Sequence, residues 1–272
     1  MTPVEPPPRP ALPLAPQSVT NWTLRRATND DLDDLTRIAI AAFAYDRQWN
    51  YRYPHAAEFP EDHYKYTRIR YGEWLDANTT PRCIIMVAEC FSPEDPGGKK
   101  VAAFSIWRVP PAHDTTEDDV DITDKLKPPS PNPDRRDASQ MHMKAYRLAT
   151  EFAQTKFFDR LLGHRQISLA QLATDPAYFR RGAATKLVEW GIEMLARKQN
   201  LPISLFAGPM GYRLYQRMGF RSVVMATVQV SGEKEELMFP GMVWKDGLRE
   251  EKEQVWDEEG VPQLFVVAEP PN

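Results

Sequence analysis

The sequence predicts a mixed α/β fold in one domain of about 230 residues, and two observations support this. First, short apolar runs that suit buried strands alternate with longer segments whose apolar residues recur at helical spacing. Second, the buried run QISLAQLAT leads through a tight joint into a helical segment and then into the short buried run PISLFA. A strand, a helix and a strand in that order predict parallel pairing of the two strands within a mixed sheet.

Composition and charge narrow the class of protein. With a net charge of −4, the chain of 272 residues has no overall basic field to hold nucleic acid or an anionic membrane. No stretch approaches the roughly 20 apolar residues of a membrane span, and the first residues do not resemble a secretory signal. Cys83 and Cys90 flank one extended run, too far apart for a disulfide, and predict two buried thiols in a reducing compartment. We therefore expect a cytoplasmic or nucleocytoplasmic protein, with neither nucleic acid nor a membrane as partner.

The N-terminal part of the chain predicts a tail, a strand and two helices. Residues 1–20 are rich in proline and predict a disordered tail. The segment WTLRRAT predicts a strand, and an asparagine or aspartate N-cap begins a helix over 31–43. Residues 44–63 mix aromatic, histidine and proline side chains and predict an irregular segment, and a second helix is expected over 61–77.

A hairpin and a long insertion come next. The runs CIIMVAE and KVAAFSIWRV flank a turn rich in Gly and Pro and predict an antiparallel hairpin. Residues 109–140 are expected to form an insertion loop, out of which a helix runs from about Arg136 to Leu162. Beyond the strand–helix–strand unit, GYRLYQRM predicts a short helix that ends at Gly219, and FRSVVMATVQV and MFPGMVWK predict two more strands. The acidic tail 249–272 ends in the apolar run LFVVA, which either docks on the domain or is disordered.

The joint after the buried strand, RRGAAT at 180–185, is a candidate anion site. The start of a helix leaves its first N–H groups unpaired and carries a partial positive charge. Small residues let an anion approach those groups, and Gly182 can adopt a positive φ where the chain must bend. Arg180 and Arg181 would add charge-assisted hydrogen bonds to a phosphate. The same residues are compatible with a capped helix beside two solvated arginines, so the joint alone leaves both interpretations open.

Other familiar sites have no counterpart in the sequence. It contains no GxxxxGK[ST] phosphate loop and no GxGxxG dinucleotide fingerprint. It also contains no HExxH or paired CxxC, so no metal site is predicted. Neither a GxSxG elbow nor a Cys–His arrangement supports covalent catalysis.

Three motifs in the right order make the sequence resemble the GNAT acetyltransferase superfamily. WTLRRATNDDLDDLTRIAIAAF resembles the first strand and helix of that family, and LYQRMGF resembles its terminal motif, a helix bearing a tyrosine followed by Gly-Phe. LATDPAYFRRGAATKLVEWG resembles its acetyl-CoA motif, Q/R-x-x-G-x-G/A after a strand and a proline. The resemblance covers about residues 21–245, implies a GNAT acetyltransferase domain over 21–248, and is greatest to fungal proteins of the small-molecule type. It implies a GNAT-like acyl-CoA N-acyltransferase fold, a central mixed sheet of six to seven strands flanked by helices.

The resemblance also implies an acetyl-CoA-dependent N-acetyltransferase. The pantetheine chain of acetyl-CoA would pair with the strand backbone at its end, and the pyrophosphate would be held by the N–H groups of the joint. The implied cofactor-binding residues are Leu172, Ala173, Thr174, Phe179, Arg180, Arg181, Gly182, Ala183, Ala184 and Thr185. Phe179 departs from the motif, which has Gln or Arg there; this removes one polar contact and shifts its role to the two arginines.

The resemblance implies one catalytic residue and leaves another open. A tyrosine at the place of Tyr215 protonates the departing thiolate in the family, and a phenol of pKa about 10 is a competent acid toward a thiol of pKa about 8.5. Many relatives use a glutamate on the fourth strand as general base, but that strand here offers Ser168 and Gln171 and no carboxylate. Either water alone carries the proton away, or a group elsewhere does. The groups considered are Glu58, Asp62, His63 and Glu89.

The acceptor is expected to lie over a set of aromatic side chains with a glutamine beside them. These residues are Tyr51, Tyr53, Tyr64, Trp107 and Gln171. The leading hypothesis is direct attack of a small-molecule primary amine on the thioester, by a protein that is a monomer or a homodimer. Two alternatives stay open: an acceptor that is a lysine or N-terminus of a protein, and a catalytically silent acyl-CoA-binding module.

Overall fold

The structure is a computed structural model that describes residues 21–91, 98–111, 134–246 and 261–268. Three segments for which the sequence made predictions lie wholly or mostly outside these ranges. They are the proline-rich tail, the central part of the 109–140 loop, and the acidic tail up to residue 260.

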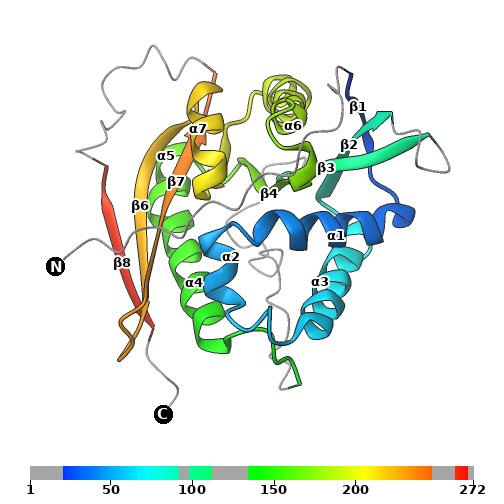
Figure 1. Cartoon of the computed structure of the whole chain (residues 1–272). Helices are drawn as coiled ribbons and strands as arrows, with labels where there is room; N and C mark the ends of the chain where they lie inside the picture. Colours follow the sequence, from blue (N-terminus) through cyan, green and yellow to red (C-terminus); the bar gives the residue numbers. More distant parts are fainter. Residues whose placement is uncertain (1–20, 92–97, 112–133, 247–260, 269–272) are drawn as a thin grey trace.

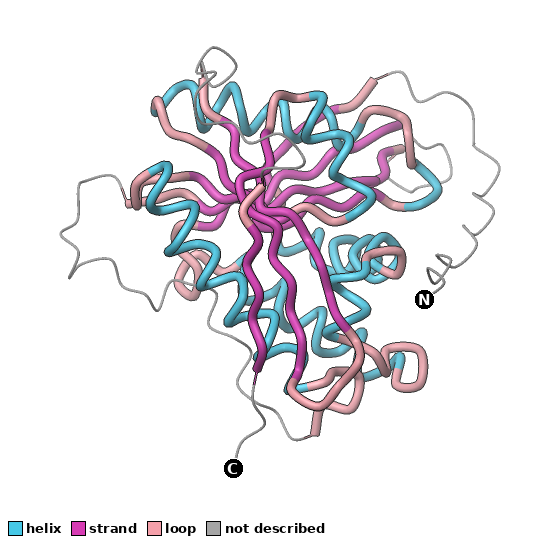
Figure 2. Tube along the Cα trace, turned by 90° about the vertical axis from the view of Figure 1, so that its left-hand side faces the viewer, coloured by secondary structure: helices cyan, strands magenta, loops and turns pink. Residues whose placement is uncertain are grey.

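The strands of the described part form one eight-stranded mixed sheet, in the order β1-β2-β3-β4-β5-β7-β6-β8 (Figures 1 and 2). The strands are β1 (Thr23–Arg26), β2 (Cys83–Phe91), β3 (Lys99–Arg108), β4 (Ile167–Thr174), β5 (Ile203–Phe206), β6 (Arg221–Val230), β7 (Glu236–Trp244) and β8 (Gln263–Ala268). Neighbours are antiparallel except for two parallel pairs, β4 with β5 and β6 with β8. The predicted hairpin (β2 and β3) and the predicted parallel pairing around the joint are therefore confirmed.

The sheet has one strand more than the six to seven that were predicted. The additional strand is β8, which contains the apolar run LFVVA and pairs with β6 along its whole length. Its buried residues Leu264 and Ala268 pack against β6 and α4 (Gln140–Ala153). The sequence left open whether this run docks or is disordered; the structure has it docked.

The helices of the described part follow the predicted order. They are α1 (Leu32–Phe43), α2 (Arg47–Arg52), α3 (Pro60–Leu75), α4 (Gln140–Ala153), α5 (Asp159–Leu162), α6 (Ala183–Gly191) and α7 (Pro209–Arg217). A π-helical turn joins α4 to α5, and another continues α6 to Arg197. The prediction that residues 44–63 are irregular is wrong over α2, a short helix capped by the Asp46 side chain. Its aromatic residues face several neighbours at once, so no apolar period marked it as a helix.

The two faces of the sheet carry different helices. On one face α1 and α3 pack side by side over β2, β3 and β4, and α4 covers β6 and β8 (Figure 1). On the opposite face α6 covers β2, β3 and β4. Alternation along β3 assigns its side chains accordingly: Phe104 and Ile106 face α1 and α3, whereas Trp107 faces α6.

Trp107 of β3 packs closely against Gly191 at the end of α6. A Cβ added to Gly191 would lie 2.1 Å from two carbons of the Trp107 ring, and that ring is fully buried. We therefore expect Gly191→Ala to lower the free energy of unfolding by about 3 kcal/mol, measured by urea denaturation. Gly72→Ala on α3 is the matched control, since the nearest atom to its added Cβ is 3.8 Å away. Equal midpoints for the two variants would contradict this packing.

Candidate active site

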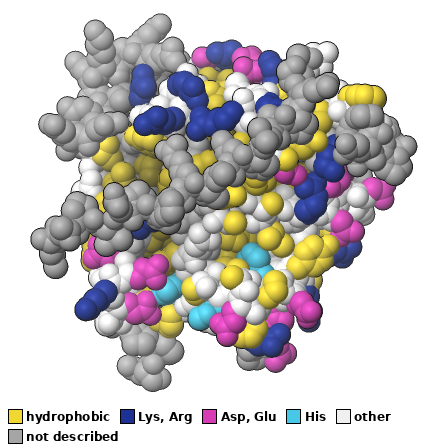
Figure 3. Space-filling view, in the orientation of Figure 1, with side chains coloured by type: hydrophobic (Ala, Val, Ile, Leu, Met, Phe, Trp, Pro, Cys, Tyr) yellow, Lys and Arg dark blue, Asp and Glu magenta, His cyan; other side chains and the backbone are white. Residues whose placement is uncertain are grey.

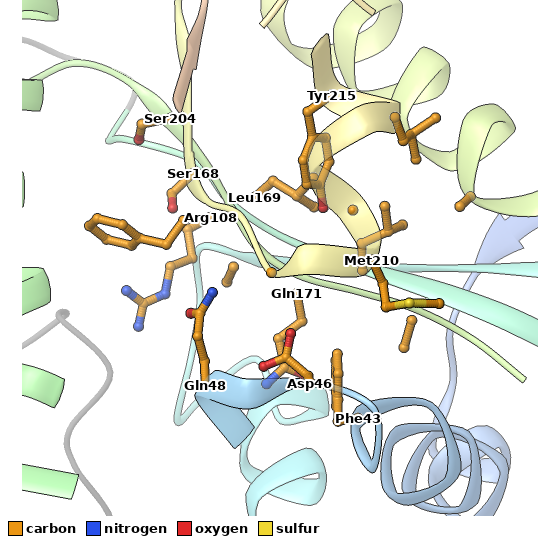
Figure 4. Close-up of a pocket in the computed structure, with 18 of the residues that line it drawn as sticks. Phe43, Asp46, Gln48, Arg108, Ser168, Leu169, Gln171, Ser204, Met210 and Tyr215 are labelled. Carbon is orange, nitrogen blue, oxygen red and sulfur yellow. The ribbon is translucent and has the colours of Figure 1, made fainter. Parts of the chain in front are cut away.

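Strands β4 and β5 separate almost as soon as they pair. Their pairing consists of Ile167 with Ile203 and Ser168 with Ser204. Beyond that point β4 keeps β3 as its neighbour on one side, and no strand of the described part pairs its other edge. The separation opens into a cleft of about 2170 Å³, shown in Figure 4. Along Leu169–Thr174 the open edge exposes backbone N–H and C=O groups that an extended amide chain can pair with.

At the end of β4 the joint adopts a conformation that aims N–H groups at the cleft. Gly182 has φ 87°, as predicted, and Arg180 has φ 63°, which is uncommon for a residue with a Cβ. The first hydrogen bond of α6 is donated by the Lys186 N–H to the Gly182 carbonyl, at 3.0 Å. Within the described part of the chain, the N–H groups from Arg180 to Thr185 have no protein acceptor. The joint is therefore a row of unpaired donors at the positive end of a helix, which suits an anion.

The arginine at the centre of the joint is held in place at both ends. The Trp22 Nε1–H donates to the Arg181 carbonyl at 2.8 Å, and the Arg181 guanidinium lies over the Tyr178 ring, 5.4 Å from its centroid. Its Nη1 is buried without a hydrogen-bond partner among the described residues. Phe179, where the motif has a polar residue, packs edge-on against Tyr45 and so contributes packing to the cleft wall.

All of the predicted cofactor-binding residues line this one cleft. They are Leu172, Ala173, Thr174, Phe179, Arg180, Arg181, Gly182, Ala183, Ala184 and Thr185. In Figure 3, lysine and arginine side chains gather on the upper part of the visible face, where Figure 1 places α6 and α7. An anionic ligand that enters from this side meets a cationic surface.

Tyr215 points from α7 into the cleft (Figure 4). Its ring is buried against Phe220, and burial raises the pKa of its phenol. The hydroxyl therefore stays protonated at neutral pH. No hydrogen bond joins it to another of the described residues, so its proton is available to a ligand in the cleft.

Asp46 was missed by the sequence interpretation and also faces the cleft (Figure 4). Its Oδ1 accepts the Trp49 N–H at 2.9 Å and so caps α2, and no cation of the described residues forms an ion pair with it. Burial raises the pKa of this carboxyl. A Cβ added to Gly208 would lie 2.0 Å from its Oδ2, so glycine at the start of α7 leaves the space that the carboxylate occupies. An unpaired, partly desolvated carboxylate of raised pKa has the properties of a general base.

The residues weighed as general base from the sequence all lie outside the cleft. They are Glu58, Asp62, His63 and Glu89. Each has a partner of its own: Glu89 pairs with Arg25 at 2.6 Å, and the His63 ring lies 2.7 Å from the buried Asp137 carboxylate. Asp46, in contrast, lines the cleft, and its charge acts on the Tyr215 phenol.

Of the predicted acceptor residues, Gln171 lines the cleft and accepts a hydrogen bond from the Tyr71 hydroxyl at 2.5 Å. The others, which lie outside the cleft, are Tyr51, Tyr53, Tyr64 and Trp107. Tyr53 is buried under α3, with its hydroxyl 3.0 Å from Arg70, and Tyr64 is exposed on the outer side of α3. The sequence identified these rings as aromatic but could not say which side of a helix or strand they occupy.

Two further properties bear on the kind of protein this is. Among the described residues, no group of His, Cys, Asp and Glu side chains is arranged to hold a metal ion. The helices of the described ranges are all too short or too polar to cross a membrane.

Comparison with known proteins finds similar structures but no matching sequence. No family model matches the sequence, and no curated protein sequence matches it. A solved structure named for insect arylalkylamine N-acetyltransferase 7, from the yellow fever mosquito, has a TM-score of 0.51 at 16% identity, over 82% of this chain and 87% of that one. A structure of histone acetyltransferase HPA2 and related acetyltransferase from Corynebacterium glutamicum has a TM-score of 0.48 at 17% identity, over 82% and 94%. The PaiA N-acetyltransferase of Thermoplasma acidophilum, solved with coenzyme A, has a TM-score of 0.46 at 11% identity, over 83% and 99%. The first similarity, together with the topology above, confirms the predicted GNAT-like fold.

Proposed function

We propose that the protein is an acetyl-CoA-dependent N-acetyltransferase that acetylates a primary amine of a small molecule by direct attack. One observation carries the proposal: the cleft between β4 and β5 leads from the unpaired N–H groups of 180–185 to a carboxylate and a phenol, Asp46 and Tyr215. An anion site at one end and an acid–base pair at the other suit a phosphate-bearing acyl donor and an amine.

The residues of the cleft fit acetyl-CoA. Its pantetheine amides would pair with the open edge of β4 at Leu172, Ala173 and Thr174. Its pyrophosphate would take the N–H groups of 180–185 and the buried, unpartnered Nη1 of Arg181. When bound, acetyl-CoA supplies the activated acetyl thioester. The polar contact that Phe179 cannot make would come from Arg181.

Two side chains of this chain would move the protons. The Asp46 carboxylate takes a proton from the amine nitrogen of the acceptor, so that the nitrogen is neutral once it is bonded to the acetyl group. The Tyr215 hydroxyl gives its proton to the departing sulfur, and the proton held by Asp46 returns through water to the tyrosine. Because burial raises both pKa values, Asp46 binds a proton more readily than a solvated carboxylate does, and Tyr215 remains protonated and able to donate at neutral pH.

The geometry of the cleft also bears on the two alternative functions, a silent acyl-CoA-binding module and an enzyme with a protein acceptor. A silent acyl-CoA-binding module has no need of a desolvated carboxylate beside a buried phenol, so the pair Asp46 and Tyr215 favours an enzyme. A protein acceptor would place a polypeptide chain in the cleft, whereas the buried polar groups there, such as Gln48 and Ser204, suit the polar groups of a compact molecule. This favours a small amine.

Calorimetric titration with acetyl-CoA tests the cofactor assignment. We expect binding in the micromolar range for the native chain and a dissociation constant raised about 10-fold for Arg181→Met, because a charge-assisted hydrogen bond to phosphate is lost. Arg197→Met is the control, since that arginine also lines the cleft but is paired with Glu193. Absence of binding at millimolar acetyl-CoA would overturn the proposed function.

Release of free CoA thiol against a panel of amines and peptides tests the reaction. Turnover of small amines at rates well above those of peptides supports the proposal. Turnover of peptides alone would assign a protein acceptor, and binding without any thiol release would identify the silent module.

A further inference from the structure

A row of polar side chains crosses the sheet where β4 and β5 are still paired. Arg108 of β3 is the register partner of Ser168 of β4, which in turn is the partner of Ser204 of β5. Register partners on neighbouring strands point to the same face. The row therefore sets Arg108, Ser168 and Ser204, in that order, on one face of three neighbouring strands.

This row faces the acceptor side of the cleft. Its strand neighbours Trp107, Ile167 and Ile203 all pack on the α6 side, so alternation turns the row to the opposite face. All three members line the cleft, and Figure 4 shows Arg108, Ser168 and Ser204 around one part of the cavity, with Asp46 in another part of it beyond Gln48.

The row has hydrogen-bonding capacity that the protein does not use. The Nη2 of Arg108 and the Oγ of Ser204 are buried without a partner among the described residues. The amide of Gln48 does not serve them, because it donates to the Ala207 carbonyl and accepts from the Tyr146 hydroxyl. A buried polar group without a partner is costly, and a ligand that satisfies it removes the cost.

The charge of Arg108 is also unbalanced. The titratable groups whose charge acts on Arg108 are Arg82, which has the same sign, and Cys83, whose pKa is raised to about 11 by burial so that the thiol is neutral. Cys83 and Cys90 are both buried and form no disulfide, as the sequence predicted. Burial lowers the pKa of Arg108 to about 10, which still leaves it charged at neutral pH. No carboxylate of the described residues forms an ion pair with it.

We propose that Arg108, with Ser168 and Ser204, binds a carboxylate of the acceptor, so that the substrate is an amine that carries a carboxylate, such as an amino acid. The planar guanidinium fork matches a carboxylate, and the serine hydroxyls of the row offer further hydrogen bonds to the same molecule. The amine of the same molecule would lie at Asp46, on the other side of Gln48. This inference rests on the proposed function, whose substrate class it narrows.

The test compares acceptors in matched pairs, each a carboxylate and the primary carboxamide of the same amine: glycine, β-alanine, γ-aminobutyrate and phenylalanine. We expect the native chain to favour the carboxylate by about 30-fold in kcat/KM in at least one pair, mainly through KM. Arg108→Met should abolish that preference by raising KM far more for the carboxylate than for the carboxamide, and Ser204→Ala should reduce it. Arg147→Met is the control, because this arginine lines the cleft but pairs with Glu151.

Two outcomes would overturn the inference: a preference for the carboxamide in every pair, or an equal loss for both members in Arg108→Met. The proposed function fails separately, by absence of acetyl-CoA binding. If acetyl-CoA binds but no amine is turned over, calorimetric titration of the same compounds is the test. Saturable binding of a carboxylate that is lost in Arg108→Met supports the site. Absence of such binding refutes it. Misfolding does not complicate the variant, because removal of an unpaired buried charge should leave the unfolding midpoint unchanged or higher.

Discussion

Asp46→Asn is expected to lower kcat/KM for acetyl transfer about 1,000-fold at neutral pH, because general-base catalysis contributes roughly 10²–10⁴-fold. The asparagine side chain keeps the shape of the aspartate and can still accept the Trp49 N–H that caps α2. It cannot take a proton from the acceptor amine. Steady-state thiol release at saturating acetyl-CoA measures the change.

The dependence of the rate on pH separates this role from a structural one. Burial raises the pKa of Asp46, so kcat/KM of the native chain should rise with pH as that carboxyl ionises. Asp46→Asn should lose this rise and keep only the change in kcat/KM that comes from deprotonation of the acceptor amine. A variant that retained the native pH profile at reduced rate would show that Asp46 acts on structure alone.

The stability of Asp46→Asn provides a second test of the role of Asp46. A carboxyl whose pKa is raised by folding stabilises the folded state below its unfolded pKa, and this contribution is lost as pH rises through the folded pKa. At pH 7 the native chain therefore bears a desolvation cost that asparagine does not, and Asp46→Asn should unfold at the same urea concentration or higher. Glu151→Gln, a change of a half-buried carboxylate that lines the same cleft and pairs with Arg147, is the control and should leave the rate unchanged and stability nearly so.

The joint could be predicted from the sequence because its chemistry is local. Gly182, the small residues after it and the arginines before it are adjacent in the chain, and the conformation they favour depends on φ and on a helix end. The same holds for the hairpin and for α7, which ends at Gly219 with φ 94°. Local signals of this kind need no knowledge of what packs on them.

Asp46 could not be found in the same way. It is one of 38 acidic residues, and its position beside Tyr215 depends on the approach of α2 to the start of α7, more than 150 residues later. The approach is possible because Gly208 has no side chain. The proximity of Asp46 and Tyr215 depends on how the two helices pack, and no sequence pattern in either segment predicts it.

The direction of side chains on a strand also could not be predicted from the sequence. Trp107 and Arg108 are neighbours on β3, and Trp107 was the one predicted to contact the acceptor. Alternation sends Trp107 to the α6 face, where it packs on Gly191, and turns Arg108 toward the cleft. A bulge in the β3–β4 pairing between Ile106 and Trp107 shifts the register at this point, which a sequence pattern does not reveal.

Tyr215→Phe is expected to lower kcat about 100-fold while the affinity for acetyl-CoA stays within about 2-fold, because the variant removes a proton donor and leaves the ring in place. The ring packs on Phe220 and fills the wall of the cleft, so phenylalanine preserves the contact. Burial keeps the native phenol protonated throughout the working pH range. The loss should therefore be nearly independent of pH, in contrast to the loss in Asp46→Asn.

Tyr212→Phe is the matched control on the same helix. The Tyr212 hydroxyl accepts from Gln216 at 3.0 Å and lies outside the cleft, so its removal should leave kcat unchanged and lower stability by about 1 kcal/mol. An undiminished turnover rate in Tyr215→Phe would remove the acid role and leave water as the donor to sulfur. If both tyrosine variants lost activity equally, the effect would belong to α7 as a packed element, since only Tyr215 reaches the reacting atoms in the proposed arrangement.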